Sequence, residues 1–397
     1  MNTVAPSSVV VVGAGLAGVR TVAELRSRGY AGDLTLVGSE PDSPYDRPSL
    51  SKQVLLTDAD PTPLDPLWLA HVDVRAGQTV TAVRPGSVET TGGELPWEAL
   101  VLALGASPRR LSGSDGGAHV LRTAADARQL RAALVPGAHV VVVGAGWIGA
   151  EVATAAAHRG CTVTVLEAGV APLVTALGPA VGARTAGWYA EAGVTLRTGA
   201  AVSTVDSRGV GLAGEGRVDA DVVVEAVGVR PRLDWLDGSG VDLDPVSGGI
   251  LVDEAGRSSL EGVLAVGDCA ARWSPRRNRR IRTEHWDDAL RAPTVVAGTL
   301  LGKTGVYDPI PYVWSEQFGR HVQWVGWRSE DVPVVWRGDP TKPTGWGAAW
   351  LDAEGRLAGY LAVDRPRDIG QARRVIDGGA VVDPAVIADP DRPLRDA

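Results

Sequence analysis

The sequence predicts an α/β protein with two dinucleotide-binding units of the Rossmann type and a separate α+β domain near its C-terminal end. Three observations predict this fold. The heptapeptide VVVVGAG occurs at Val9–Gly15 and returns unchanged at Val140–Gly146. An apolar strand that runs into a GxxPR sequence also occurs twice, as Ala99–Leu104 before Gly105–Arg109 and as Asp221–Val227 before Gly228–Arg232. Beyond Tyr307 the chain becomes rich in tryptophan, which indicates a change of architecture.

The first copy of the heptapeptide opens a βαβ unit. Val9–Val12 reads as a buried strand, Gly13–Gly18 (GAGLAG) as the turn and Val19–Arg28 as a helix. Asp33–Val37 follows as the second strand, and Glu40 lies close to its end.

The second copy repeats this order. Val140–Val143 reads as a strand, Gly144–Gly149 (GAGWIG) as the turn, and a helix runs to about Arg159. The next strand, Thr162–Leu166, ends at Glu167. The first glycine and the acid are 27 residues apart in the first unit and 23 apart in the second.

Further strands complete the expected organisation. Gly262–Val266 resembles the two GxxPR strands and ends in Gly267-Asp268. Beyond Tyr307, six of the 13 tryptophans fall between Trp314 and Trp350, among short alternating segments such as His321–Trp327 and Trp346–Leu351. This pattern predicts antiparallel strands in a third domain.

Length and composition exclude several classes of protein. A chain of 397 residues is long enough for two or three hydrophobic cores. Its net charge of −8 argues against a nucleic-acid binder, which needs a basic field. We find no long apolar run and no cationic segment ahead of an apolar one, so we expect a cytoplasmic protein without a membrane span. Two cysteines cannot form a disulfide framework or CxxC pair, and the six histidines show no metal-ligand spacing.

Each glycine-rich turn has the pattern that a pyrophosphate requires. The first glycine (Gly13, Gly144) makes the tight turn, and the second (Gly15, Gly146) lets the backbone approach the phosphates. The third (Gly18, Gly149) lets helix and strand pack closely. A single match could be a glycine-rich turn without a ligand. Two matches, each between a strand and a helix and each followed by an acid, predict two bound dinucleotides.

Two acidic residues are candidates for ribose recognition. Glu167 lies where a carboxylate would accept hydrogen bonds from both ribose hydroxyls of a nicotinamide cofactor and repel a 2′-phosphate, which favours NADH over NADPH. Glu40 is the corresponding candidate in the first unit. A solvated glutamate at the end of a strand is the alternative in both cases.

Two further segments are candidates for the ligand crevice. Gly267 and Asp268 follow a buried strand at the carboxyl end of the sheet, where Asp268 is either a ligand contact or a helix cap. The proline-framed loop Pro44–Lys52 contains one of only three lysines among 39 basic residues. Lys52 is therefore either a selected functional residue or a solvated side chain.

These residues together carry a family resemblance. The chain closely resembles the FAD-dependent NADH:ferredoxin reductases. The motifs that carry the resemblance are PYDRPSLSK (Pro44–Lys52), the two glycine loops, GDCA (Gly267–Ala270), TEHWDDAL (Thr283–Leu290) and PYVWSEQFG (Pro311–Gly319). This family serves Rieske-type dioxygenases and bacterial haem monooxygenases. The resemblance covers nearly the whole chain in order, and PYDRPSLSK and the tryptophan-serine motif are its most specific parts.

The resemblance implies a set of site residues. The predicted FAD contacts are Ala14, Leu16, Ala17, Glu40, Arg47, Lys52, Val80, Arg122, Asp268 and Trp286, and Gly13, Gly15, Gly18, Ala103, Gly105 and Gly267 complete the cofactor-binding set of this domain. The predicted NADH residues are Gly144, Gly146, Ile148, Gly149, Glu167 and Gly228. The resemblance also implies that Lys52 lies by the reactive flavin nitrogen and pairs with Glu151, and that Trp314 stacks near the nicotinamide or the flavin.

The resemblance further implies a glutathione-reductase-like architecture. We expect an FAD-binding domain at residues 1–112 and 245–307, an NAD-binding domain at 113–244 and a C-terminal reductase domain at 308–397. The nicotinamide should stack on the flavin where the two dinucleotide domains meet. The expected activity is oxidation of NADH through FAD, with single electrons passed to a ferredoxin of the two-iron two-sulfur type that serves an oxygenase. The alternatives are an NADH oxidase or small-molecule reductase without a protein acceptor, and a non-catalytic protein resembling apoptosis-inducing factor.

The sequence also contains two departures from the family pattern and one charge run. Family members usually have threonine where Leu104 precedes Gly105, and many carry an arginine soon after Glu167, whereas this chain has none before Arg184. The charge run comprises five arginines between Arg276 and Arg282. That run predicts either a docking patch for an acidic ferredoxin or a solvated basic loop.

Overall fold

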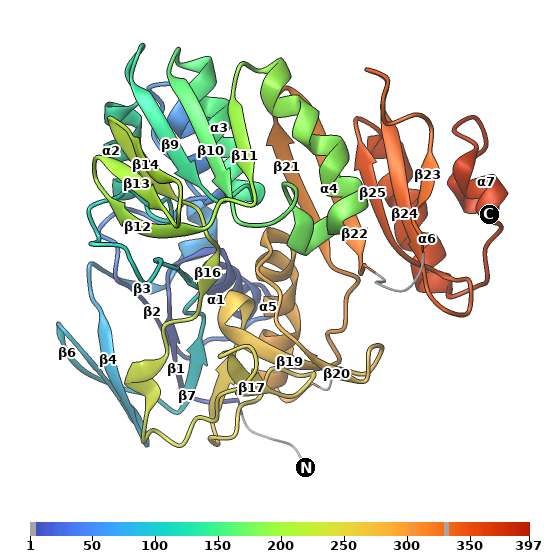
Figure 1. Ribbon diagram of the computed structural model, residues 1–397. Coiled ribbons are helices and arrows are strands. Elements are labelled where there is room, and N and C mark those ends of the chain that lie inside the picture. The colour runs from blue at the N-terminus through green and yellow to red at the C-terminus, as the bar shows by residue number, and fades with distance from the viewer. Residues whose placement is uncertain (1–4, 304, 329–332) are drawn as a thin grey trace. The chain divides into compact units, whose positions relative to one another are not determined.

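The structure is a computed structural model that describes residues 5–303, 305–328 and 333–397 (Figure 1). The chain forms two compact units. Unit 1 comprises the chain up to Ser49 together with Asp60–Ser107 and Val229–Pro309. Unit 2 comprises Leu50–Ala59, Pro108–Gly228 and Ile310–Ala397.

Unit 1 is built on a parallel sheet in the order β18-β7-β1-β2-β3 (Figure 1). Its strands are β1 (Ser8–Val12), β2 (Asp33–Gly38), β3 (Asp73–Ala76), β7 (Ala99–Leu102) and β18 (Val263–Ala265). Both faces of this sheet are covered. Val9 and Val11 pack with helices α1 (Leu16–Ser27) and α5 (Trp286–Leu300), whereas Val10 and Val12 pack against the opposite cluster. Burial on both faces explains the unbroken valine run of β1.

The second cluster of unit 1 includes an antiparallel meander. Its strands are β4 (Val80–Arg84), β5 (Ser87–Thr90) and β6 (Gly93–Pro96). The remaining elements of this unit are η2 (Pro66–Leu69), β16 (Val229–Arg230), η3 (Asp234–Leu236), β17 (Ile250–Val252), η4 (Gly267–Cys269), β19 (Ala270–Ser274) and β20 (Arg279–Ile281). β8 (Ser107–Pro108) lies at the boundary between the units.

Unit 2 repeats the plan with the parallel order β11-β10-β9-β15. Its strands are β9 (His139–Val143), β10 (Thr162–Glu167), β11 (Thr195–Thr198) and β15 (Val222–Glu225). Alternate valines of β9 again face opposite sides, toward α3 (Trp147–His158) or toward the meander β12 (Val202–Asp206), β13 (Gly209–Leu212) and β14 (Gly216–Asp219). The unit also contains η1 (Leu50–Val54), α2 (Ala124–Ala133) and α4 (Val174–Glu191).

The C-terminal part of unit 2 is an antiparallel sheet in the order β21-β22-β25-β24-β23, drawn in orange and red in Figure 1. Its strands are β21 (Tyr312–Gln317), β22 (Arg320–Gly326), β23 (Val335–Arg337), β24 (Trp346–Leu351) and β25 (Leu357–Val363). Helices α6 (Pro366–Gly378) and α7 (Pro384–Ala388) and the short η5 (Leu394–Asp396) complete it. The tryptophan-rich region therefore forms the antiparallel strands that its alternating pattern predicts.

The predicted elements are present, with shifted ends. The helices after the two glycine turns begin at Leu16 and Trp147, because Gly15 and Gly146 are already their N-caps. The strands expected to end at Leu104, Val227 and Val266 end two, two and one residues earlier. Within the described ranges, no helix is both long and apolar enough to cross a membrane, and no cluster of His, Cys, Asp or Glu could hold a metal ion.

Candidate functional site

The glycine turn of unit 1 has two glycines that packing requires and one that it does not. Gly13 has φ +108°, and a Cβ atom there would lie 2.1 Å from the carbonyl oxygen of Ala103. A Cβ atom on Gly18 would lie 1.9 Å from the oxygen of Gly13. At Gly15 the nearest described atom is the flexible end of Arg47, 3.9 Å away. Open space at the middle glycine is what a pyrophosphate needs in order to approach the backbone.

The turn of unit 2 repeats this geometry. Gly144 has φ +104° and faces the oxygen of Ala226, which would lie 2.5 Å from an added Cβ atom. Gly149 faces the oxygen of Gly144 in the same way, at 2.0 Å. No described atom lies within 4 Å of a Cβ atom on Gly146. Neither Gly15 nor Gly146 gives its helix a side-chain cap, so the N–H groups of both first turns are suited to a phosphate. Both loops fit a dinucleotide.

The acid of unit 2 is held by the backbone. Glu167 ends β10, and its two oxygens accept hydrogen bonds from the N–H groups of Ala145 and Gly169, each at 2.7 Å. Glu167 is therefore an oriented carboxylate beside the glycine loop and not a freely solvated side chain. Because each oxygen has a further lone pair, the carboxylate can still accept from ribose hydroxyls.

The acid of unit 1 occupies a different position. Val12 pairs with Val37 as Val143 pairs with Leu166, so Gly38 corresponds to Glu167 in the sheet. A Cβ atom on Gly38 would lie 2.6 Å from the Cβ of Ala14, which excludes a side chain there. The candidate acid lies two residues further on, at Glu40.

Side chains of the proline-framed loop hold Glu40. Tyr45 Oη donates to Glu40 Oε2 at 2.6 Å, and Arg47 Nη2 donates to Oε1 at 2.8 Å. The Arg47 side chain thus contacts Glu40 and also lies beside the open position at Gly15. Tyr45 was not among the residues that sequence reasoning selected, although it lies within PYDRPSLSK.

The other candidates of unit 1 lie on several elements of that unit. Gly267 has φ +75°, and its Cβ position lies 3.0 Å from the Cβ of Ala17. Asp268 lies inside η4, whose N-cap is Val266, so Asp268 is not the N-cap of that helix. Buried Ala103 donates its N–H to Val12 at 2.8 Å, and Gly105 follows with φ +64°. Val80 is buried in the cluster beside β1.

The start of α5 is tied to the proline-framed loop. Trp286 begins the helix, and its Nε1 donates to Asp46 Oδ1 at 2.6 Å. Desolvation lowers the pKa of the preceding, half-buried His285 to about 4, against the opposing effects of Asp268 and Asp287. Sequence reasoning missed Asp46 and His285, although both belong to motifs that it singled out.

A cluster of polar side chains surrounds Glu151 in unit 2. Glu151 lies on α3 and is 4% exposed. Lys52 Nζ donates to its Oε1 at 2.9 Å, and the hydroxyl groups of Ser51 and Ser315 also donate to the carboxylate. The predicted pair of Lys52 and Glu151 is present, and the alternative of a solvated lysine is wrong, since the side chain of Lys52 is only 18% exposed.

The remaining candidates of unit 2 are distributed along several elements. Trp314 precedes Ser315 on β21 and stacks on Tyr312 at 6.1 Å. Ile148, in the second glycine loop, is 43% exposed, and Gly228 has φ +94°. Arg122 stands before the capping box that begins α2. Lys52 and Arg122 thus belong to unit 2, whereas the other predicted FAD contacts belong to unit 1.

The arginine run forms the hairpin of β19 and β20, and its members differ in role. Arg280 Nη1 donates to the carbonyl oxygens of Val252 and Ala271 at 2.8 and 3.3 Å. Arg282 Nη1 donates to the carbonyl oxygen of Asp268 at 3.1 Å and pairs with Glu284. These two arginines support the fold, so they contribute less than the other three to either a docking patch or a solvated basic loop.

Comparison with known proteins identifies the family. Residues 7–292 match the model of the pyridine nucleotide-disulphide oxidoreductases, and residues 312–397 match that of the reductase C-terminal domain. The chain is 37% identical to the ferredoxin–NAD(+) reductase component of the anthranilate 1,2-dioxygenase system of Burkholderia cepacia, covering 97% of this chain and 98% of the relative. The chain belongs to the FAD-dependent NADH:ferredoxin reductases. FAD and NAD are its cofactors, as the resemblance of its motifs implies.

Solved structures show the same fold over the whole chain. The crystal structure of Fdr9 matches with a TM-score of 0.92 and 50% identity, covering 98% of this chain and 99% of the other. The covalent complex of putidaredoxin reductase with putidaredoxin also matches with a TM-score of 0.92, at 30% identity, covering 99% of this chain and 98% of the other. The glutathione-reductase-like α/β fold is thereby confirmed.

Proposed function

We propose that this protein oxidises NADH through FAD and passes the electrons singly to a two-iron two-sulfur ferredoxin that supplies an oxygenase. The observation that carries the proposal is the repeated glycine turn, with open space at Gly15 and Gly146, in a chain of this reductase family. When bound, FAD can accept a hydride and release its two electrons one at a time, and the protein supplies binding, orientation and electrostatics.

In this proposal each dinucleotide has its own domain. Residues 1–112 and 245–307 bind FAD, residues 113–244 bind NADH, and residues 308–397 form the reductase domain. The first glycine loop receives the FAD pyrophosphate, Glu40 and Arg47 face its adenosine part, and Asp268 its linker. In the NAD domain, Glu167 accepts from the ribose hydroxyls of NADH and repels the 2′-phosphate of NADPH.

We assign Lys52, Glu151 and Trp314 to the reaction itself. The Lys52 ammonium would stabilise the negative charge that the flavin gains on reduction, and Glu151 would hold that ammonium in place. Trp314 would stack near the nicotinamide or the flavin. These roles follow from the family resemblance and are supported by the burial of the Lys52–Glu151 pair.

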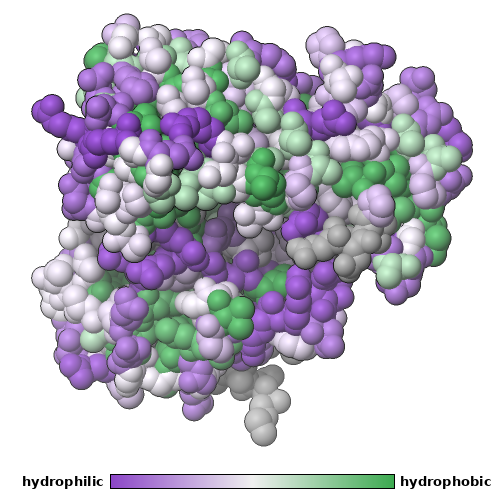
Figure 2. All heavy atoms as spheres, in the orientation of Figure 1, coloured by the Kyte–Doolittle hydropathy of each residue, from purple (hydrophilic) through white to green (hydrophobic). Residues whose placement is uncertain are grey.

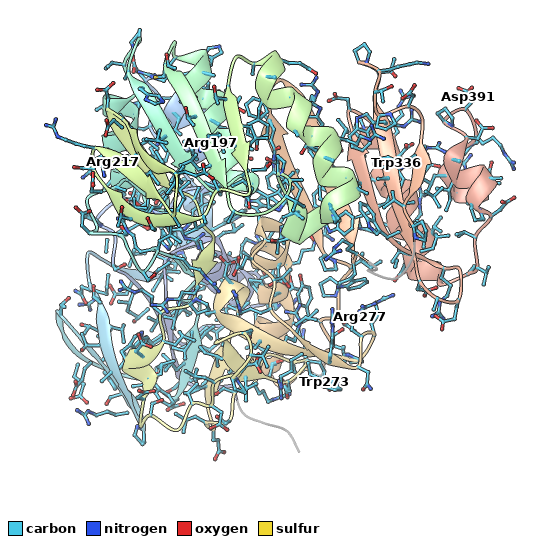
Figure 3. The ribbon with its side chains drawn as sticks, in the orientation of Figure 1. Arg197, Arg217, Trp273, Arg277, Trp336 and Asp391 are labelled. Atoms are coloured by element: carbon cyan, nitrogen blue, oxygen red, sulfur yellow. The ribbon has the colours of Figure 1, made fainter. Side chains whose placement is uncertain are left out.

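The exposed part of the β19–β20 hairpin is the proposed docking surface for the ferredoxin. We define this surface by Trp273, Arg276 and Arg279, which lie at the solvent side of the hairpin. Figure 2 shows a strongly hydrophilic surface over this hairpin, and Figure 3 labels Trp273 and Arg277 on it.

Hydrogen bonds to Asp308 stabilise the turn of the hairpin. Asp308 accepts from the hydroxyl of Ser274 at 2.6 Å and from the N–H of Arg276 at 2.7 Å. Arg282 fastens the hairpin to the backbone of Asp268. A rigid basic surface on a protein of net charge −8 would attract an acidic partner and orient it.

Two alternative functions can be distinguished from this one by measurement. An NADH oxidase or small-molecule reductase would consume oxygen rapidly without ferredoxin, and a protein resembling apoptosis-inducing factor would turn over slowly with every acceptor. We propose the cytoplasm as the compartment, since NADH is oxidised and regenerated there.

The decisive experiment adds candidate ferredoxins to the purified flavoprotein and measures NADH-driven cytochrome c reduction. A stimulation by ferredoxin supports the proposal, and rapid oxygen uptake with no stimulation by any ferredoxin contradicts it.

A further inference from the structure

Glu151 receives three side-chain donors from two distant segments of unit 2. Ser51 Oγ donates to Oε2, and both Lys52 Nζ (2.9 Å) and Ser315 Oγ (2.6 Å) donate to Oε1. Lys52 and Ser315 therefore share one carboxylate oxygen. An ammonium on a flexible four-carbon stem has no preferred direction of its own, so the direction of this oxygen determines where Lys52 points.

The hydroxyl of Ser315 can donate in only one direction. Gln317 is 1% exposed, and its Nε2 lies 3.0 Å from Ser315 Oγ. An ionised carboxylate only accepts and an amide nitrogen only donates, so the single hydroxyl hydrogen must point at Glu151. The order of donation is Gln317 to Ser315 to Glu151.

The strand that carries this serine is fixed to α3 at a second point. The N–H of Phe318, at the turn after β21, donates to Thr154 Oγ1 at 3.0 Å. Ser315 itself is fully buried. Its hydroxyl is therefore placed by a rigid strand and not by a mobile side chain.

We propose that Ser315, supported by Gln317, is a positioning residue that orients the Lys52 ammonium through Glu151. This inference rests on the proposed role of Lys52 in flavin reduction. Ser315 contacts neither flavin nor nicotinamide in this account. Without its hydroxyl, Oε1 keeps only the Lys52 donor, and the carboxylate can turn and carry the ammonium with it. Small displacements of a catalytic group are costly in rate, on the order of 100-fold for about 1 Å.

The test is anaerobic stopped-flow reduction of the FAD-loaded Ser315→Ala protein by NADH. We expect the limiting rate of flavin reduction to fall roughly tenfold, as for loss of a hydrogen bond to a charged acceptor, with the dissociation constant of NADH unchanged. Ser315→Thr, which keeps the hydroxyl, should restore most of the rate. Thr185→Val is the matched control, since it removes a buried hydroxyl that donates to the carbonyl of Gly182 at 2.9 Å, and it should leave the rate unchanged.

The effect of Ser315→Ala on the rate of flavin reduction must disappear when Lys52 is absent. In a Lys52→Met background, Ser315→Ala should cause no further loss of rate, because there is no ammonium left to orient. A further loss equal to that in the wild type would make the role of Ser315 merely structural and overturn the inference. If Ser315→Ala folds poorly, Gln317→Met should give a smaller decrease in the same direction, and an unchanged rate would contradict the inference.

The proposed roles of Lys52 and of Ser315 can be disproved separately. If Lys52→Met itself leaves flavin reduction unchanged, the proposed role of Lys52 is wrong. If Lys52→Met slows the reaction and Ser315→Ala does not, only the positioning role of Ser315 is wrong.

Discussion

The two glycine loops are alike in backbone and different in the acid that follows them. Gly13 and Gly144 have φ +108° and +104°, and in both loops the third glycine faces the carbonyl oxygen of the first. The next strand ends in Gly38 in unit 1 and in Glu167 in unit 2. A pyrophosphate is bound by backbone N–H groups, which require the same glycines each time. A ribose is bound by a side chain, which can reach its target from more than one position.

The two acids also differ in what orients them. Backbone N–H groups hold Glu167, whereas the side chains of Tyr45 and Arg47 hold Glu40. Substitutions in one loop should therefore affect one dinucleotide and leave the other bound.

The largest effect is expected from the third glycines. Gly18→Ala and Gly149→Ala each place a Cβ atom at about 2 Å from a carbonyl oxygen, and such overpacking costs about 1–3 kcal/mol of stability locally. Gly18→Ala should abolish retention of FAD. The Gly149→Ala protein should purify yellow because FAD is bound, but NADH should reduce little of its flavin. Loss of FAD in both variants, measured by flavin absorbance, would contradict the independence of the two loops.

Lys52→Met should slow flavin reduction by NADH roughly 100-fold while FAD stays bound, because removing one donor from a site of developing charge typically costs that much. Stopped-flow absorbance under anaerobic conditions gives the rate, and the flavin-to-protein ratio gives the occupancy. A rate equal to that of the wild type would remove Lys52 from the reaction.

Substitutions of Glu167 and Glu40 should affect different properties: the preference for NADH over NADPH in the first case and the retention of FAD in the second. We expect the wild type to prefer NADH over NADPH by at least about tenfold, roughly 1.4 kcal/mol, since Glu167 repels a 2′-phosphate. Glu167→Gln should narrow that preference without loss of FAD. Glu40→Gln should weaken FAD binding and leave the preference intact. Equal kcat/KM values for the two nicotinamide cofactors in the wild type would refute the role of Glu167.

The smallest effect concerns the docking surface. Arg276→Glu with Arg279→Glu should raise the KM for ferredoxin severalfold and leave the KM for NADH unchanged. Ferredoxin reduction in the wild type should slow as the Debye length falls from about 30 Å to about 8 Å. Arg208→Glu, an exposed arginine in unit 2, is the control. Arg280 is unsuitable for charge reversal, because its guanidinium supports the backbone of β17 and β19. A salt-independent ferredoxin rate would place docking elsewhere.

Sequence alone predicts the repeated strands and glycine turns because their signals are local. The position of Glu40, two residues beyond the strand position that Glu167 occupies in unit 2, is not predictable in that way. It depends on the register of β1 with β2 and on the contact of Gly38 with Ala14. The bond between Ser315 and Glu151, which are 164 residues apart, is not predictable in that way either. The division of the arginine run into supporting and exposed members likewise depends on which carbonyl groups lie within reach. The Lys52–Glu151 pair was predicted only through the family resemblance.

The passage of NADH electrons through FAD to a one-electron acceptor can be measured by its stoichiometry. The FAD-loaded protein is mixed anaerobically with limiting NADH and excess two-iron two-sulfur ferredoxin, and both NADH absorbance and ferredoxin absorbance are followed. The account predicts two ferredoxin molecules reduced for each NADH consumed, because a hydride carries two electrons and each cluster accepts one. Consumption of NADH without reduction of ferredoxin, or a purified chain that will not take up FAD, would contradict it.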